Sequence, residues 1–345
     1  MRAAVLREYN ADLALEDVPD PDCPEDGVVL KVLACGVCRS DWHGWSGEHP
    51  RVKPGQIGGH EYAGEVVAAG PRATYRVGDR VVAPFILACG TCPSCHSGHS
   101  NTCPNQRLPG FVEPGAFAEY VAVPFDHNLA RLPESLTPTV AAGLGCRVTT
   151  AWHALTGRAA LEAGEWLAVH GTGGIGLATL ILGRALGARV VVVDVVEEKL
   201  SHALGLGAEA AVNARDGDTA ALIREITRGG AHVSVEALGI ADTANASIEC
   251  LRPLGRHVQV GMPVGHTARM EINMNAVYMG NLALYGTRGM PAWKYPSLLG
   301  LIEAGRVDVA PMIAREIGLS GVSAELRAMN GPTPPGVAVV TDLLG

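Results

Sequence analysis

The sequence predicts an α/β protein of two domains, a compact barrel-like β module followed by a doubly wound parallel sheet. Three observations support this prediction. The chain has 345 residues, more than a single hydrophobic core usually serves. Short strand-like runs crowd roughly its first 150 residues, which favours a β module. From about Glu165 onward, strand-like and helix-like segments alternate, as they do in a parallel sheet.

The composition excludes several classes of function. Lys and Arg total 27 against 35 Asp and Glu, a net charge of −8, and no basic run offers a surface for nucleic acid or an anionic membrane. No apolar run approaches the ~18–20 residues that span a bilayer. The N-terminal residues 1–8 show neither a long apolar region nor a cleavage site, so we expect no signal peptide. A cytoplasmic protein acting on small molecules is expected.

The predicted β module rests on closely spaced runs of strand-forming residues. Turn signals such as Pro19-Asp20-Pro21-Asp22 and Val77-Gly78-Asp79 separate these runs. The spacing is too short for helical crossovers, so a barrel-like arrangement is favoured over βαβ units. The expected strands are Arg2–Leu6, Leu13–Val18, Val28–Leu33, Tyr62–Ala69, Arg80–Ala83 and Phe117–Val123.

Four cysteines inside this module follow the spacing Cys89-x2-Cys92-x2-Cys95-x7-Cys103. Four thiolates can close a tetrahedron around Zn²⁺ without leaving room for water, which makes a structural site. An iron–sulfur cluster is the rival, because Pro104 follows Cys103. The bacterial ferredoxin run, however, ends in a three-residue gap and belongs to a two-cluster protein. The longer last gap and the lack of a second set favour structural zinc.

A second ligand set is spread along the chain at Cys38, His60 and Cys146. Each residue alone would be interpreted as a buried thiol or a core histidine. Together they provide two thiolates and one imidazole with one coordination position left open, as a catalytic zinc requires. Glu61 is the competing third ligand, although a role beside the metal is favoured for it.

The second domain opens with a dinucleotide-binding fingerprint. The apolar strand Trp166–His170 leads into Gly171-Thr172-Gly173-Gly174-Ile175-Gly176, a helix through about Leu186, and a strand over Arg189–Val193 that ends at Asp194. The glycines let the backbone approach a pyrophosphate at the helix N-terminus. Asp194 is placed to accept hydrogen bonds from the adenosine ribose. This succession of a strand, a glycine turn, a helix and a second strand that ends in an acidic residue predicts dinucleotide binding.

The alternation continues and predicts a six-stranded doubly wound sheet. It ends past Gly289, where Tyr295–Ala304 is expected to be helical and Gly336–Asp342 to form a final strand. The further strands are expected near Ala210–Val212, His232–Glu236, Arg256–Val260 and Leu282–Tyr285.

Taken together, these motifs resemble the zinc-dependent medium-chain alcohol dehydrogenases along essentially the whole chain. The resemblance lies in residues 38–43 and 59–61, the four-cysteine lobe, Cys146, and Gly171–Gly176 with Asp194. It implies a GroES-like catalytic domain of residues 1–152 and 290–345, a Rossmann domain of residues 153–289, and an active site in the cleft between them. Residues 43–50 look especially like the yeast and bacterial tetrameric members, so a homo-oligomer is expected, with a tetramer favoured over a dimer.

The same resemblance assigns roles at the catalytic centre. Zinc held by Cys38, His60 and Cys146 lowers the pKa of an alcohol. Ser40 passes the hydroxyl proton toward the nicotinamide ribose, and His43 delivers it to solvent. The implied reaction is reversible oxidation of a primary or secondary alcohol to an aldehyde or ketone, with hydride transfer to NAD⁺.

Other residues are implied to support the metal or the cofactor. Asp41 and Glu61 orient the ligands and tune the zinc, and Phe85 forms a wall of the substrate pocket. Arg39 pairs with the pyrophosphate, and Lys199 lies near the adenosine ribose. The alternatives are that Arg39 is merely solvated and that Lys199 is an ordinary surface lysine. The expected cofactor-binding residues are Arg39, Thr150, Gly171, Gly173, Gly174, Ile175, Gly176, Asp194 and Lys199.

Two positions depart from the family pattern, and other functions stay open. Ala338 stands where some relatives have a pyrophosphate-contacting arginine, and His49 replaces a tryptophan of the yeast-like enzymes. The rival functions are a zinc-free enone or quinone reductase, a polyol dehydrogenase, and a non-enzymatic cofactor-binding protein on the same scaffold. The expected cofactors are NAD and two zinc ions per chain.

Overall fold

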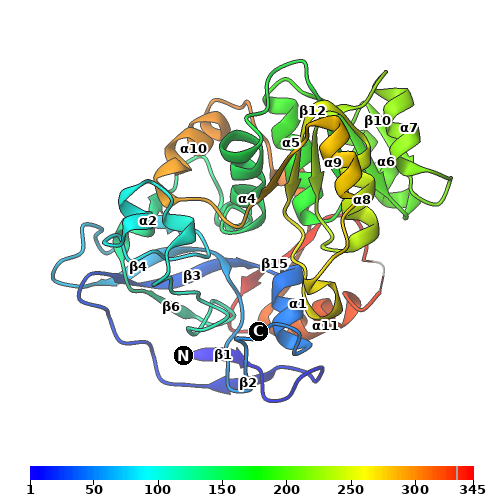
Figure 1. Cartoon of the computed structure of the whole chain (residues 1–345). Helices are drawn as coiled ribbons and strands as arrows, with labels where there is room; N and C mark the ends of the chain where they lie inside the picture. The colour runs from blue at the N-terminus through cyan, green and yellow to red at the C-terminus, as the bar shows by residue number, and fades with distance from the viewer. Residues whose placement is uncertain (332) are drawn as a thin grey trace.

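The computed structural model describes residues 1–331 and 333–345, without the side chain of His266. It contains a two-stranded, a six-stranded and a seven-stranded sheet. Figure 1 shows the seven-stranded sheet at the lower left and the six-stranded sheet at the upper right, with helices around the latter. The predicted fold class, a GroES-like β domain joined to a Rossmann-like parallel sheet, is confirmed.

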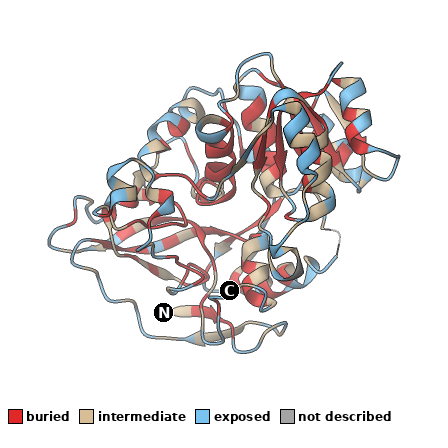
Figure 2. Cartoon of the chain, in the orientation of Figure 1, coloured by how far each residue is buried: buried red, intermediate tan, exposed pale blue. Residues whose placement is uncertain are grey.

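All strands of the six-stranded sheet pair in parallel, in the order β10-β9-β8-β11-β12-β13. The central strands carry mostly Val, Leu and Ala, which are buried on both faces of the sheet (Figure 2). All six strands overlap the predicted segments, although β12 begins at Leu251 and not near Arg256. Their bounds are β8 Trp166–His170, β9 Arg189–Asp194, β10 Ala210–Asn213, β11 Ala231–Glu236, β12 Leu251–Gln259 and β13 Ala283–Gly286.

Helices cover both faces of this sheet. The first of them, α5 (Gly174–Ala185), starts directly at the glycine turn and ends one residue before the predicted boundary. Its close approach to β8 requires glycine, because a Cβ on Gly176 would lie 1.8 Å from the carbonyl oxygen of Gly171. The other helices here are α6 Glu197–Gly205, α7 Thr219–Ile226, α8 Ala241–Glu249 and α9 Met274–Gly280.

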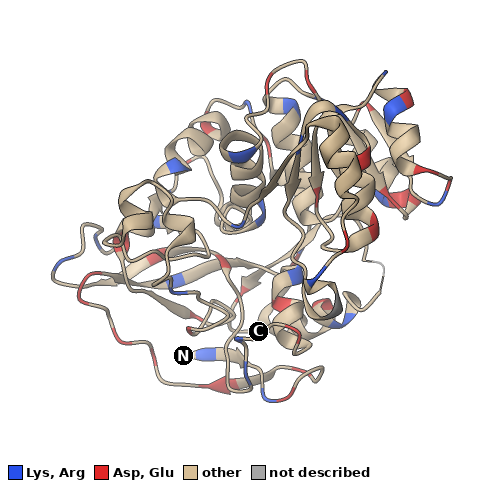
Figure 3. Ribbon diagram, viewed as in Figure 1, with Lys and Arg blue, Asp and Glu red and all other residues tan. Residues whose placement is uncertain are grey.

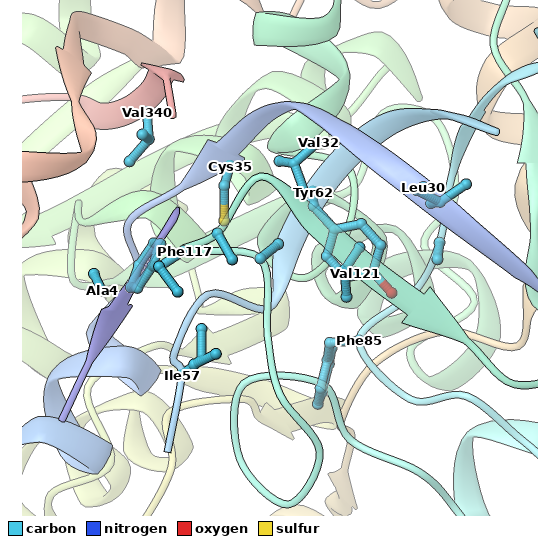
Figure 4. Packing of buried hydrophobic residues seen from close by; sticks show 14 of the residues in the cluster. Ala4, Leu30, Val32, Cys35, Ile57, Tyr62, Phe85, Phe117, Val121 and Val340 are labelled. Atoms are coloured by element: carbon cyan, nitrogen blue, oxygen red, sulfur yellow. The ribbon is translucent and has the colours of Figure 1, made fainter. Parts of the chain in front are cut away.

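The β domain is mostly antiparallel and contains the six strands predicted for the first part of the chain, the predicted final strand β15, and two that the sequence did not reveal, β7 and β14. Its core brings together residues that are far apart in the chain, such as Ala4, Tyr62 and Val340 (Figure 4). The strands are β1 Arg2–Val5, β2 Ala14–Asp17, β3 Val28–Gly36, β4 Glu61–Ala69, β5 Arg80–Val82, β6 Tyr120–Val123, β7 Ala130–Arg131, β14 Ile313–Gly318 and β15 Val337–Asp342.

The C-terminal segment returns to this domain. Strand β15 pairs antiparallel with β3, with Val340 opposite Cys35, and parallel with β14. The remaining helices are α1 Arg39–Trp45, α2 Pro93–His96, α3 Pro138–Ala142, α4 Arg147–His153, α10 Tyr295–Glu303 and α11 Val322–Ala328. Among the described residues, no helix is both long and apolar enough to cross a membrane.

Candidate active site and metal centres

Cys38, His60 and Cys146 meet in one buried cluster together with Glu61. One ligand atom from each of the four side chains lies within 4.8 Å of the others. Cys38 follows the end of β3 and caps α1, whereas Cys146 caps α4. His60 immediately precedes β4. Thus two strands and two helices that are distant in sequence deliver the three predicted ligands to one place.

Asp41 fixes the orientation of His60. Its Oδ1 lies 2.8 Å from His60 Nδ1 and accepts a hydrogen bond from the Gly59 amide at 3.1 Å, while Oδ2 accepts one from the Cys38 amide at 3.0 Å. Burial works against a charged His60, but Asp41 and Cys38 together outweigh burial and raise the pKa of His60. Because Nδ1 faces this carboxylate, Nε2 is the nitrogen that points at the two sulfurs. A carboxylate behind a ligating histidine is the common arrangement at zinc.

The donor set fits a zinc ion. His60 Nε2 is buried without a hydrogen-bond partner, which is costly unless another group occupies that position. A hydrogen bond from the Cys146 thiol lowers the pKa of Cys38 and favours a thiolate there, although burial acts in the opposite direction. Two sulfurs, one imidazole nitrogen and a neighbouring carboxylate are ligands that zinc prefers.

Glu61 is engaged by Arg147, a residue that the sequence analysis did not single out. Both side chains are almost fully buried, and Arg147 Nη2 lies 2.6 Å from Glu61 Oε2. The hydrogen bond of Nη2 goes to the Val37 carbonyl, at 2.8 Å. The contact of Nη2 with Glu61 is therefore an ion pair and not an aligned hydrogen bond. The Arg147 amide donates to Glu61 Oε1 at 3.1 Å. Burial raises the pKa of Glu61 to about 8, against the opposing pull of Arg147.

The ion pair explains two local features of the sequence. A Cβ on Gly36 would lie 2.5 Å from Glu61 Oε2, so glycine is needed opposite this carboxylate. A Cβ on Gly174 would lie 3.0 Å from Cδ of Arg147. Arg147 therefore packs between the metal cluster and the glycine turn. The signal in the sequence was an arginine inside the otherwise apolar run 141–148.

Ser40 and His43 lie beside the metal cluster on α1. Ser40 Oγ is 3.9 Å from Cys38 Sγ. His43 has a side chain that is 13% exposed, and its Nδ1 lies 2.7 Å from Glu48 Oε2. Burial lowers the pKa of His43, although Glu48 pulls it upward. A neutral imidazole at the edge of the site can accept a proton at physiological pH.

A cavity of about 510 Å³ connects these residues with the glycine turn. Cys38 and Cys146 lie at one part of its wall, and Ile175 lies at another. Phe85, the predicted pocket wall, and Phe111 pack against the His60 ring, with centroids 5.8 and 4.7 Å away. Other lining residues include Arg39, Ser40, His43, His49, Leu108, Thr150, Leu238, Met262 and Arg288.

The glycine turn fits a dinucleotide. A Cβ on Gly173 would meet no atom within 4 Å, so the backbone is open in front of α5. Gly171 has φ +92°, a left-handed conformation that favours glycine. Burial alone would raise the pKa of Asp194, but hydrogen bonds from Thr172 and the Val195 amide outweigh it and lower that pKa. An ionised carboxylate at the end of β9 matches the fingerprint.

The other expected cofactor residues have contacts within the chain. Arg39 donates to the Met329 carbonyl and lies over the Trp42 ring at 4.2 Å. Lys199 Nζ is 3.4 Å from Thr333 Oγ1. Thr150 Oγ1 accepts a hydrogen bond from the Gly289 amide at 3.1 Å. Of these three residues, Arg39 and Thr150 line the cavity and Lys199 does not.

The four cysteines of the lobe form a separate cluster. The sulfur of Cys92 lies 3.4 Å from that of Cys95 and 3.8 Å from that of Cys103. Cys103 Sγ is 3.5 Å from Cys89 Sγ. Tetrahedral zinc with Zn–S bonds of about 2.3 Å places its sulfurs about 3.8 Å apart. The lobe therefore fits a closed four-thiolate zinc site.

Comparisons with known proteins agree with this geometry. The family described as alcohol dehydrogenase GroES-like domain matches residues 24–134, and the family described as zinc-binding dehydrogenase matches residues 174–304. An alcohol dehydrogenase of Geobacillus stearothermophilus is 36% identical over 76% of this chain and 78% of its own length. An L-threonine 3-dehydrogenase of Symbiobacterium thermophilum is 32% identical over 99% of this chain and 98% of its own.

Solved structures show the same likeness. The alcohol dehydrogenase of Thermus sp. ATN1 superposes with a TM-score of 0.92 at 29% identity, covering 99% of this chain and 100% of that one. The chain therefore belongs to the zinc-type family of medium-chain alcohol dehydrogenases and is an oxidoreductase of that family.

Proposed function

We propose that the protein reversibly oxidises a primary or secondary alcohol to an aldehyde or ketone, with NAD⁺ as the hydride acceptor. The observation that carries the proposal is one cavity lined both by Cys38 and Cys146 and by Ile175 of the glycine turn. Hydride transfer needs the alcohol carbon and the nicotinamide in contact, and a shared cavity allows this.

The chain supplies the surroundings for this chemistry. Cys38, His60 and Cys146 hold the zinc, and Asp41 keeps His60 in the tautomer that ligates through Nε2. When bound, zinc lowers the pKa of an alcohol hydroxyl toward neutrality, and NAD⁺ takes up the hydride. Glu61 points both oxygens at Arg147, so we assign it a tuning role and not a permanent ligand position.

The proton leaves along α1. Ser40 Oγ lies close enough to the Cys38 sulfur to contact a hydroxyl bound at the metal cluster. His43, on the same helix and partly exposed, passes the proton to solvent. The oxidation thus yields a carbonyl group, one hydride on the cofactor and one proton in water.

The cofactor is held by Gly171–Gly176, Asp194, Arg39 and Thr150, with Lys199 near the ribose.

We further propose a catalytic domain of residues 1–152 and 290–345 and a cofactor domain of residues 153–289, supported by the pairing of β15 with β3. A cytoplasmic homo-oligomer, with a tetramer favoured over a dimer, completes the proposal. The exposed apolar residues Met274, Tyr278 and Met279 on α9 support self-association, which sedimentation of the purified protein tests.

A panel of alcohols assayed with NAD⁺ and NADP⁺, on protein of measured zinc content, tests this function. NAD⁺ should be preferred by at least ~100-fold in kcat/KM, or ~2.7 kcal/mol, because Asp194, Glu197 and Glu198 repel a 2′-phosphate. Replacing Asp194 with Gly and Val195 with Arg should remove most of that preference. Equal or better efficiency with NADP⁺ in the unmodified protein would contradict the cofactor assignment. Absence of turnover by zinc-loaded protein would contradict the activity.

A further inference from the structure

The active-site cavity adjoins a second one, and residues of β13 and the loop after it separate the two. Gly286, Thr287 and Arg288 line both the 510 Å³ cavity and a neighbouring cavity of about 380 Å³. The walls of the second cavity are polar and come from the lobe, from the end of α4 with the turn after it, and from this loop. Its other lining residues are His99, Asn101, Thr102, Gln106, His153 and Arg158.

Apart from the thiols of the metal cluster, the charged side chains that line these two cavities are all basic. Arg39, Arg158 and Arg288 line them, and among the described lining residues there is no Asp or Glu. This contrasts with the chain as a whole, which has a net charge of −8, with acidic and basic residues mixed over its outer elements (Figure 3). A cationic pocket in an acidic protein attracts and orients an anionic ligand.

Of the three arginines, Arg288 is the one placed to meet a substrate. Arg39 donates to the Met329 carbonyl and stacks on Trp42, and Arg158 lies over the Tyr285 ring at 5.3 Å. Arg288 is exposed and forms no ion pair among the described residues, and its Nη2 donates only to the Gln106 side chain. Most of its guanidinium donors are therefore free for a ligand.

The Phe85 ring relates Arg288 to the metal cluster, because both Arg288 and the metal ligand His60 lie near it. The His60 and Phe85 ring centroids are 5.8 Å apart, and the Arg288 guanidinium lies 5.8 Å from the Phe85 centroid. Phe85 belongs to the buried cluster of the β domain, below Tyr62 in Figure 4, so its ring is held in place. The metal ligand His60 and the guanidinium of Arg288 thus both lie within about 6 Å of the same phenyl ring.

We propose that the substrate is an alcohol that also carries a carboxylate or phosphate group, which Arg288 binds while the hydroxyl lies at the metal cluster. The inference rests on the proposed alcohol oxidation and specifies its substrate class. A guanidinium matches two oxygens of either anion with parallel hydrogen bonds, which fixes orientation as well as affinity. The apolar walls Phe85, Leu108 and Phe111 hold the part of the substrate between the two ends.

The test compares substrates that differ only in charge. 4-(Hydroxymethyl)benzoate and its neutral amide share one ring between carbinol and polar group, and 4-(hydroxymethyl)phenyl phosphate distinguishes phosphate from carboxylate recognition. The unmodified enzyme should favour one anion over the amide by about 10- to 100-fold in kcat/KM. Arg288→Gln should abolish this preference by lowering kcat/KM for the anion far more than for the amide. Arg306→Gln removes a cation that lines neither cavity and should leave the preference intact.

A binding measurement separates this inference from the proposed activity. 4-(2-Hydroxypropan-2-yl)benzoate is a tertiary alcohol with no hydrogen to transfer, and calorimetry on the NADH complex can compare it with its amide. Tighter binding of the acid, lost in Arg288→Gln, supports the inference even if no alcohol is turned over. Equal binding and equal kcat/KM for acid and amide would overturn it. It would also be overturned if Arg288→Gln weakened NAD⁺ binding and slowed acid and amide alike, because Arg288 would then serve the cofactor.

Discussion

The four-cysteine lobe and the metal cluster of the active site use the same ligand chemistry but are built differently. The lobe takes its four sulfurs from residues 89–103, whereas the active site takes its ligands from positions 38, 60 and 146. Charged side chains surround the active-site ligands, with Asp41 on His60 and Arg147 on Glu61. No such ion pair joins the lobe cysteines among the described residues. Four cysteines of one loop can surround a metal ion without further support. Ligands that come from separate elements need neighbouring side chains to hold them in position.

The largest effect should follow from breaking the distributed site. Cys38→Ser should remove one zinc per chain and lower kcat/KM by at least about 1,000-fold, because the several kcal/mol supplied by the metal are lost. Metal analysis and steady-state kinetics measure both. Cys23→Ser is the matched control, since Cys23 is exposed and lies outside both clusters. A fully active Cys38→Ser enzyme would refute the catalytic assignment.

The buried ion pair should give the next largest effect. Arg147→Met leaves the buried Glu61 carboxyl group without its cationic partner, so that group must either stay charged or take up a proton, which should cost about 3–5 kcal/mol of unfolding free energy. Adding Glu61→Gln should recover part of that loss, because the carboxyl group that lost its partner is then gone. The exposed pair Arg189–Glu209 serves as control, and Arg189→Met should cost less than about 1 kcal/mol in the same denaturation experiment. A single variant as stable as the parent would argue against this partnership.

The lobe should affect stability and leave the chemistry unchanged. Cys103→Ala opens the four-thiolate site, so the second zinc should be lost and Tm should fall by about 5 °C or more. The kcat/KM of the folded fraction should change by less than about twofold, because the lobe cysteines do not line the active-site cavity. Calorimetry with parallel kinetics tests this. A zinc-loaded variant of unchanged Tm would contradict the structural role.

The smallest effect concerns the pH profile. Glu48 raises the pKa of His43 while burial lowers it, so Glu48→Gln should lower that pKa further. If His43 must be neutral to accept the proton, the acid limb of the kcat/KM profile moves to lower pH. Glu225→Gln, on the outer surface of α7, should leave the profile in place. A shift to higher pH would show that His43 does not govern this limb.

The sequence predicted local features better than features built from distant segments. Local motifs were predicted closely, since the lobe, the glycine turn and β8 carry their signals within a few residues. Strands β7 and β14 were missed because β7 has two residues and β14, at the edge of its sheet, has no fully buried position. Strand β12 starts at Leu251, earlier than predicted, because Pro253-Leu254-Gly255 has the composition of a turn.

Arg147 shows the limit of sequence analysis at the site. Its partner Glu61 is 86 residues away, and the packing of α3, the helix before α4, against β3 and β4 brings the two together. Arg147 stands next to Cys146 in the sequence, but nothing in the spacing indicated a partner for it. The role of Arg288 could not be predicted for the same reason, because the two cavities that it lines form only where segments distant in sequence meet.

X-ray absorption at the zinc edge, on the Cys38→Ser and Cys103→Ala proteins, tests the two-centre account most directly. The account predicts one zinc in each variant. In Cys38→Ser the remaining ion should have four sulfur neighbours at about 2.3 Å and no nitrogen. In Cys103→Ala it should have two sulfurs with nitrogen and oxygen neighbours. A histidine nitrogen in the spectrum of Cys38→Ser, or an all-sulfur site in Cys103→Ala, would contradict it.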